Sequence, residues 1–359
     1  MSAVDEALFE RNLPKIMKFN SDRAVKNAED FWARREEIKR ILAEEEYGYI
    51  PKKPDHLSVE LITEESFCAG KATHRLLKFI ATIGEHEFSF PVQSVIPKGE
   101  GIYPAFIHID FEGGVPTKFT PIEEITDGGF AVFSFSYEDI TRDDGNFKNG
   151  IAKHFGSRRR ASAPGKLAIW AWAAMRVMDY VETLPEINKS RTAVIGHSRL
   201  GKAALLAGAF DERFQYVISN NSGCSGASLS RKTTGETVVA ITNRFPYWFC
   251  PKYVKCAVDF AEKSKFDQHF LLSLIAPRHL IVGSAKDDLW ADPTNEFLSA
   301  VAASEGYNVL GVKGLIHNGE LPKDNVLFNE GNICYYKRSG EHYLSREDWQ
   351  TYMKYITES

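Results

Sequence analysis

Short apolar runs alternate with helix-like segments along most of the chain, and this alternation limits the fold more than any other feature of the sequence. The runs are rich in Val, Ile, Phe and Ala, and they cover residues 103–110, 129–137, 190–196, 214–220, 278–285 and 332–337. Apolar strands that are separated by helices form parallel sheets, because the helices cover both faces of the sheet. The sequence therefore predicts an α/β fold with a mostly parallel central sheet between two layers of helices.

Three strand candidates precede this region and have the spacing of antiparallel neighbours. They cover residues 56–62, 74–83 and 87–96. Before them, residues 26–46 predict a helix with three apolar side chains on one side, Phe31, Ile38 and Leu42. We expect an N-terminal helical extension, residues 1–46, and one large domain, residues 47–359, whose antiparallel N-terminal strands join the parallel sheet.

The charge and the apolar content argue against nucleic-acid and membrane partners. The formal net charge is −4, and no dense stripe of Lys and Arg is present. No apolar stretch approaches the length of a membrane span. The N-terminal segment mixes charges into every turn, unlike a secretory leader. We therefore expect a cytoplasmic protein, or a secreted one whose leader lies outside this sequence.

The sequence predicts neither a disulfide framework nor a metal site. The five cysteines are an odd number, and no two of them have Cys-x-x-Cys spacing. No set of His, Cys, Asp and Glu has the spacing of metal ligands. The redox compartment therefore stays open, and we expect neither a metal nor a cofactor.

Ser198 stands at the joint between one predicted strand and an Ala- and Leu-rich helical segment. The sequence "TAVIGHSRLGKAALLAGAF" reads as strand, sharp turn and helix, with Gly196 and Gly201 on either side of the serine. Such a joint exposes the serine oxygen at the carboxyl edge of the sheet, beside the free N–H groups of the helix. A nucleophile needs this placement, although Gly201 lies one position later than in the Gly-x-Ser-x-Gly pattern. The alternative is a serine that only caps the helix, which is common before Ala-rich helices.

Two later strand ends supply the other residues of a triad in the chain order Ser, Asp, His. The segment "KDDLWADP" follows the strand at 278–285 and offers Asp287 and Asp288 as acids. His342 follows the last strand and precedes an amphipathic terminal helix. His317 is a rival base, because it also follows a strand-like run. His342 is preferred, because strand, loop, histidine and helix follow one another there in order.

Six segments together resemble the bacterial glucuronoyl esterases, a family of carbohydrate esterases. The segments are "IGHSRLGKAALLAGAFDERF", "ISNNSGCSGASLSR", "GETV", "FPYWFC", "FDQHFLLSLIAPRHLIVGSAKDDLWADP" and "SGEH". The resemblance covers most of the chain from about Tyr47 onward. It implies a three-layer α/β-hydrolase fold and a serine esterase without a cofactor. The ester that the family cleaves joins the carboxyl group of (4-O-methyl)glucuronate on xylan to alcohols of lignin.

The resemblance also implies roles for individual residues. Ser198 matches the nucleophile, His342 the base, and Arg199 the arginine that stabilises the oxyanion. Three residues match positions that hold the uronate sugar: Lys202, Glu236 and Trp290. These residue types suit the roles, because a guanidinium stabilises an alkoxide, Lys and Glu bind hydroxyls, and an indole covers a pyranose ring.

Two positions depart from the family pattern. Some members carry the catalytic acid where this chain has Asn221, and asparagine cannot carry the charge. The acid is then expected at Asp288, which has the family's spacing from Trp290, with the adjacent Asp287 as the alternative. Arg244 stands near the place of a sugar-binding glutamine, where a cation can still reach hydroxyls.

The function expected from these residues is hydrolysis of glucuronate esters through an acyl-enzyme. Glucuronate-bearing xylan fragments or small uronate esters would be the substrates. The alternative enzyme is a deacetylase of acetylated xylan or other sugars, which would place the acetyl group on the serine. A different class is a non-catalytic carbohydrate-binding relative, which a broken triad would mark.

Overall fold

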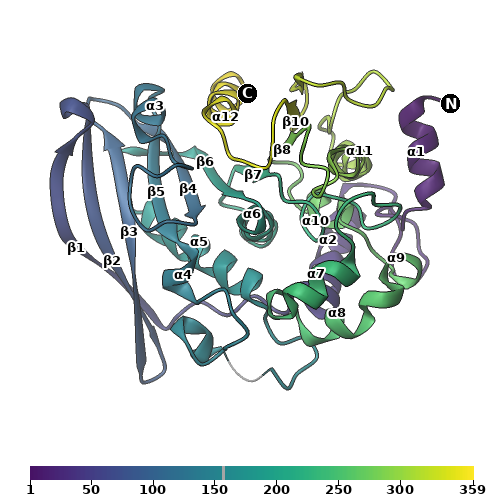
Figure 1. Cartoon of the computed structure of the whole chain (residues 1–359), viewed down its shortest axis with the longest axis horizontal. Coiled ribbons are helices and arrows are strands. Elements are labelled where there is room, and N and C mark those ends of the chain that lie inside the picture. The colour runs from purple at the N-terminus through teal and green to yellow at the C-terminus, as the bar shows by residue number, and fades with distance from the viewer. Residues whose placement is uncertain (156–157) are drawn as a thin grey trace.

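One ten-stranded sheet forms the centre of the molecule in the computed structural model, which describes residues 1–155 and 158–359 (Figure 1). Its strand order is β1-β2-β3-β5-β4-β6-β7-β8-β10-β9. The strands are β1 (His56–Phe67), β2 (Ala72–Ile83), β3 (His86–Pro97), β4 (Tyr103–Asp110), β5 (Ala131–Ser136), β6 (Ile187–His197), β7 (Tyr216–Asn220), β8 (His279–Ala285), β9 (Val326–Phe328) and β10 (Ile333–Arg338).

The middle of the sheet is parallel and its edges are antiparallel. Neighbouring strands from β5 through β4, β6, β7 and β8 to β10 pair in parallel. The first three strands pair antiparallel, β3 joins β5 antiparallel, and β9 pairs antiparallel with β10. This topology confirms the predicted α/β fold with antiparallel N-terminal strands.

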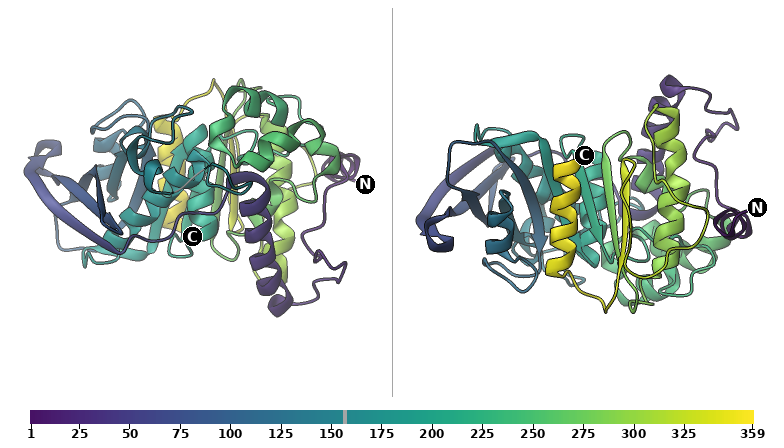
Figure 2. Two further views of the ribbon diagram at one scale, coloured as in Figure 1. Left: turned by 90° about the horizontal axis from the view of Figure 1, so that it is seen from below. Right: turned by 90° about the horizontal axis from the view of Figure 1, so that it is seen from above.

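Helices cover both faces of this sheet. The α-helices are α1 (Ala3–Arg11), α2 (Ala28–Leu42), α3 (Ile122–Asp127), α4 (Tyr137–Ile140), α5 (Lys166–Val181), α6 (Arg199–Phe210), α7 (Val238–Arg244), α8 (Pro251–Cys256), α9 (Phe260–Lys263), α10 (His269–Ser273), α11 (Pro293–Val309) and α12 (Arg346–Glu358). Figure 1 shows α6 and α12 on opposite sides of the sheet, and the view from above in Figure 2 shows α12, in yellow beside the C-terminus, running roughly along the strands.

Two hydrophobic clusters correspond to the two faces. The first joins α2, α5, α6, α10 and α11 to strand residues such as Ile107 and Val194. The second joins α3 and α12 to Phe106 and Ile195, the neighbours of those residues in the strands. Successive strand residues point to opposite faces, so the sheet separates two buried layers and the molecule has three layers.

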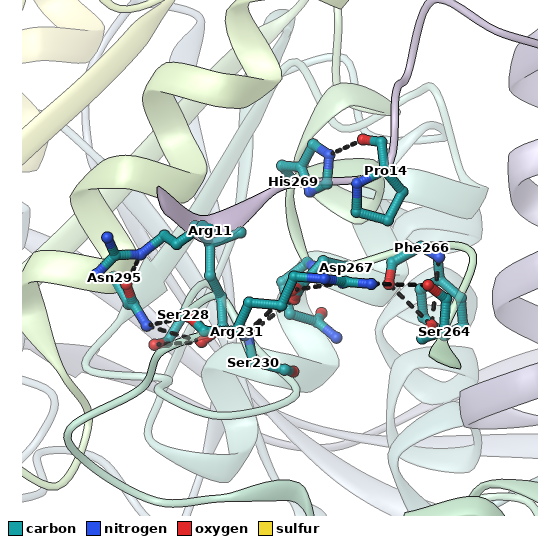
Figure 3. A network of polar contacts seen from close by, with 12 residues as sticks. Arg11, Pro14, Ser228, Ser230, Arg231, Ser264, Phe266, Asp267, His269 and Asn295 are labelled. Atoms are coloured by element: carbon teal, nitrogen blue, oxygen red, sulfur yellow. Dashed lines mark hydrogen bonds and ion pairs between the residues drawn. The ribbon is translucent and has the colours of Figure 1, made fainter. Parts of the chain in front are cut away.

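The N-terminal extension shares the first of these clusters. Its predicted helix is α2, whose Phe31 and Ile38 are fully buried in that cluster. Figure 3 shows two contacts that hold the end of α1 and the segment after it against the domain. Arg11 Nε donates to Asn295 Oδ1 at 2.7 Å, and the His269 ring forms a hydrogen bond with the Pro14 carbonyl at 2.8 Å. The boundary expected at residue 46 therefore lies between two segments that pack together, and the division into two parts stays a prediction.

Two searches of the described residues concern membrane spans and metal sites. No helix in the described ranges is both long enough and apolar enough to cross a membrane. Within the same ranges, no three or more His, Cys, Asp and Glu side chains are grouped as a metal site would need. The five cysteines are all free thiols.

Candidate active site

The joint between β6 and α6 has the strained geometry of an exposed nucleophile. Ser198 has φ 58° and ψ −127°, a conformation that a non-glycine residue rarely adopts. A Cβ at Gly196 would lie 2.2 Å from the Leu200 carbonyl oxygen, so only glycine lets the helix turn back so closely. Among the described contacts, the Ser198 side chain makes no capping hydrogen bond with α6. This geometry favours a nucleophile over a simple helix cap.

His342 and Asp288 form a direct pair at the same edge of the sheet. His342 Nδ1 lies 2.6 Å from Asp288 Oδ2. The Asp288 side chain is buried, whereas the His342 side chain is 44% exposed, so a substrate can reach the ring. Burial raises the pKa of Asp288, but hydrogen bonds from His342, Asn221 and the Ala291 N–H outweigh it and hold that pKa below its usual value. The carboxylate is therefore ionised where it faces the imidazole.

The structure separates the two alternatives at this pair. Asp287 is exposed, and no hydrogen bond or ion pair among the described residues joins its side chain to His342; its backbone N–H donates to the Gly340 carbonyl. His317 lies against Phe297, 6.0 Å between ring centroids, and accepts a hydrogen bond from the Gly319 N–H. Neither residue joins the His342 pair.

Asn221 supports the acid instead of replacing it. Its Nδ2 donates to Asp288 Oδ2 at 2.9 Å, and its backbone N–H donates to the Gly283 carbonyl. The residue has φ 48°, a left-handed conformation that asparagine tolerates well. The position that departs from the family pattern therefore holds a neutral hydrogen-bond donor to the carboxylate.

His197 lies beside the nucleophile but is buried and neutral. Its ring centroid is 4.5 Å from that of His342, and its Nδ1 bonds to Asn220 Oδ1 at 2.7 Å. Burial, together with the neighbouring His342, lowers the pKa of His197 to about 3. Because His197 directly precedes Ser198, this ring contact places His342 near the serine. It therefore supports grouping Ser198, His342 and Asp288 as a triad.

Arg199 lies directly after the serine, among aromatic rings. Its Cζ is 4.9 Å from the ring centroid of Trp248 and 5.4 Å from that of Phe245. Its Nη1 forms an ion pair with Asp143, and Asp143 also accepts a hydrogen bond from Trp248 Nε1 at 2.6 Å. The guanidinium is thus held in place before any substrate arrives.

Three of the four predicted sugar-binding residues lie together. Glu236 donates its backbone N–H to the Trp290 carbonyl at 2.9 Å, and the Trp290 side chain is largely exposed. Lys202 is buried, and its Nζ donates to the carbonyls of Ser222 and Cys224. Burial lowers the pKa of Lys202, and the nearby Glu236 carboxylate raises it. A lysine Nζ has three donors, so one remains for a ligand.

Arg244 lies at the end of α7 and stacks on a neighbouring ring. Its Cζ is 5.1 Å from the centroid of Phe245, the ring that also contacts Arg199. The side chain is exposed. No contact among the described residues joins it to Lys202, Glu236 or Trp290, so its role in sugar binding stays a prediction.

Sequence reasoning missed Asp143, which contacts Arg199 across 56 positions of the chain. Trp248 lies within the segment "FPYWFC", but its residue type alone indicates no role. Asp143 has no motif and no spacing of its own, so only its contacts reveal it. Asn221 was recognised as a departure, but its bond to Asp288 was not foreseen.

Comparison with known proteins identifies the family. A family model described as glucuronyl esterase, fungi, matches residues 80–311. A carbohydrate esterase from an unknown prokaryotic organism is 39% identical over 246 residues, which are 67% of this chain and 56% of that protein. The 4-O-methyl-glucuronoyl methylesterase of Cerrena unicolor is 29% identical over 318 residues, 84% of this chain and 62% of that enzyme. The chain thus spans less than two thirds of the length of either relative.

Solved structures agree over nearly the whole chain. A glucuronoyl esterase from Solibacter usitatus is 32% identical with a TM-score of 0.89, and the match covers 96% of this chain and 97% of that one. A promiscuous CE15 esterase from a marine bacterial metagenome is 30% identical with a TM-score of 0.88 and covers 96% of both chains. The motifs, the serine joint and these matches agree, and the chain belongs to the glucuronoyl esterase family.

Proposed function

We propose that this chain is a serine esterase that hydrolyses esters of (4-O-methyl)glucuronic acid, as in links between xylan and lignin. The observation that carries the proposal is the position of Lys202, Glu236 and Trp290 as one group at the end of the sheet that also carries the paired His342 and Asp288. Curated relatives named 4-O-methyl-glucuronoyl methylesterase support it. Uronate-bearing xylan fragments or small uronate esters are the proposed substrates.

In the proposed reaction, Ser198 Oγ attacks the ester carbonyl carbon and His342 takes the hydroxyl proton. Asp288 keeps the ring oriented and stabilises the imidazolium that forms. Arg199 and backbone N–H groups stabilise the oxyanion of the tetrahedral intermediate. His342 then donates its proton to the departing alcohol, and the uronate stays on Ser198 as an acyl group. Water repeats the sequence and releases the uronic acid.

The side of the ester that the site recognises distinguishes this proposal from deacetylation. In a glucuronate ester the sugar is the acyl part, so its hydroxyls stay within reach of Lys202 and Glu236 throughout the reaction. In an acetylated sugar the acyl part is too small to reach them, and the sugar leaves as the alcohol. Contacts of Lys202 and Glu236 with the acyl part would therefore favour a uronate ester over an acetate ester.

The test compares benzyl glucuronate, acetylated xylose and p-nitrophenyl acetate as substrates of the wild type and of Ser198→Ala. We expect benzyl glucuronate to give the highest kcat/KM, and Ser198→Ala to lose turnover by several orders of magnitude. Ser190→Ala, which changes an exposed serine, is the matched control. Preference for acetylated xylose would indicate the deacetylase. Binding of uronate without turnover of any ester would indicate a non-catalytic relative.

A further inference from the structure

The guanidinium beside the nucleophile is held by a carboxylate from a distant loop. Asp143 lies just after α4, and its side chain is only 7% exposed. One of its oxygens, Oδ2, pairs with Arg199 Nη1. The other, Oδ1, accepts the Trp248 Nε1–H at 2.6 Å. Both carboxylate oxygens are therefore engaged, and the pair is largely shielded from water on that side.

Aromatic rings restrict the same guanidinium on its other sides. Its Cζ lies 4.9 Å from the Trp248 centroid, 5.4 Å from that of Phe245 and 5.8 Å from that of Phe111. The Trp248 and Phe245 rings stack at 3.9 Å with 2° between their planes. Trp248 thus contacts the cation with its ring and fixes the counter-ion with its N–H. A planar cation held this way has little rotational freedom.

The contact with Asp143 engages Nη1 and leaves other N–H donors of this guanidinium without a partner among the described residues. Arg199 Nε is buried and has no hydrogen-bond partner among the described residues. A buried donor without a partner costs stability, and this one belongs to the residue directly after Ser198. The side chain as a whole is 27% exposed, and Asp143 engages only Nη1, so the guanidinium keeps donors for an atom that arrives with the substrate.

We propose that Asp143 is a positioning residue for ester hydrolysis, which holds the Arg199 guanidinium so that its remaining donors face the oxyanion. The proposal rests on the serine esterase mechanism above but not on the identity of the acyl group, because every ester forms the same oxyanion. Loss of the positioning contact should therefore lower kcat for acetate and glucuronate esters alike. KM should change little, because the contact matters most in the transition state.

The first variant is Asp143→Asn, which keeps the shape and an acceptor for Trp248 Nε1 but removes the charge. We expect kcat to fall ten- to a hundredfold with both p-nitrophenyl acetate and benzyl glucuronate, roughly the effect of losing one charged contact to the transition state. KM should stay within threefold of the wild-type value. Asp144→Asn is the matched control. It removes the neighbouring carboxylate of the same loop, which binds Lys166 Nζ at 3.0 Å and not Arg199. We expect kcat within about twofold of the wild type there.

A double-mutant cycle with Arg199→Ala separates positioning from general support of the fold. If Asp143 acts through Arg199, adding Asp143→Asn to Arg199→Ala should lower kcat by less than about twofold further. An equal loss in both backgrounds would overturn the proposal, and so would an unchanged kcat in folded Asp143→Asn. If that variant does not fold by circular dichroism, Trp248→Phe repeats the cycle, because it keeps a ring and removes the N–H that binds Asp143.

The outcomes also keep this proposal distinct from the substrate assignment. A wild type that hydrolyses acetate but not glucuronate contradicts the proposed substrate, and the Asp143 cycle still decides the present proposal on acetate. A wild type that hydrolyses neither ester contradicts both proposals.

Discussion

Replacing Asp288 by asparagine should lower ester turnover far more than the same change at its neighbour. Asp288 Oδ2 receives both His342 Nδ1, at 2.6 Å, and Asn221 Nδ2, at 2.9 Å. Its Oδ1 receives the Ala291 N–H at 3.3 Å. An amide at this position has one oxygen, so its NH₂ group must face one of these donors. The arrangement that keeps oxygen toward His342 turns the NH₂ group toward Ala291.

The charge makes the larger contribution to the expected loss. Even in the favourable arrangement, the imidazolium of the transition state loses the carboxylate that stabilises it. In serine hydrolases this change lowers kcat by roughly a thousandfold or more, which corresponds to about 4 kcal/mol of transition-state stabilisation. The ground-state fold should change much less, because the side chain keeps its shape.

The assay measures kcat for p-nitrophenyl acetate near neutral pH for Asp288→Asn and Asp287→Asn, with thermal unfolding of both. Asp287→Asn is the control, because that side chain is exposed, whereas His342 pairs with Asp288. We expect its kcat to stay within a few-fold of the wild type. A larger loss in Asp287→Asn than in Asp288→Asn would refute the reasoning, and so would an Asp288→Asn enzyme with more than a tenth of wild-type kcat.

Three further predictions follow from the contacts described above. Glu236→Gln should lower kcat/KM for benzyl glucuronate about ten- to a hundredfold, which is the effect of losing one charged hydrogen bond. The kcat/KM for p-nitrophenyl acetate should stay nearly unchanged. Equal losses for both esters would contradict the uronate role of Glu236. Because the pKa of Asp288 is held below its usual value, its ionisation stabilises the fold above the pKa of an unfolded aspartate, about 3.9, and this contribution is lost as pH falls through the lowered pKa. The difference in unfolding free energy between the wild type and Asp288→Asn should therefore shrink between roughly pH 5 and pH 2, as pH titrations of chemical unfolding can measure. Arg11→Ala should cost about 1 to 3 kcal/mol in urea unfolding, because it leaves the buried Asn295 oxygen without its donor. Arg23→Ala, which breaks an exposed ion pair in the same N-terminal segment, should cost much less.

The sheet could be predicted because its strands differ from the helices in hydrophobic period and length. Runs such as 103–110 and 278–285 correspond closely to β4 and β8. The chain order of strand ends then placed Ser198, Asp288 and His342 at one edge, because parallel strands end on the same side. These parts of the fold and of the site depend on local sequence and on a general rule of topology.

Contacts between distant loops could not be predicted in the same way. Trp248 Nε1 meets Asp143 across 105 positions, and nothing in either segment indicates the other. Lys202 was expected to bind sugar, and its residue type gave no sign that two backbone carbonyls occupy its Nζ. Arg11 likewise reaches Asn295 from 284 positions away. Such contacts depend on how loops fold over the sheet, which hydrophobic periodicity does not specify.

The asparagine at position 221 has a physical reason once the acid lies at Asp288. Its Nδ2 and His342 Nδ1 both donate to the same carboxylate oxygen. A second carboxylate at 221 would lie within hydrogen-bond distance of Asp288, and two such groups cannot both stay ionised without a large rise in one pKa. A protonated acid would hold the imidazolium less well. A neutral donor instead lowers the pKa of Asp288 and keeps the charge on the oxygen that faces the histidine. With a charged acid at the end of β8, the end of β7 is therefore best occupied by an amide.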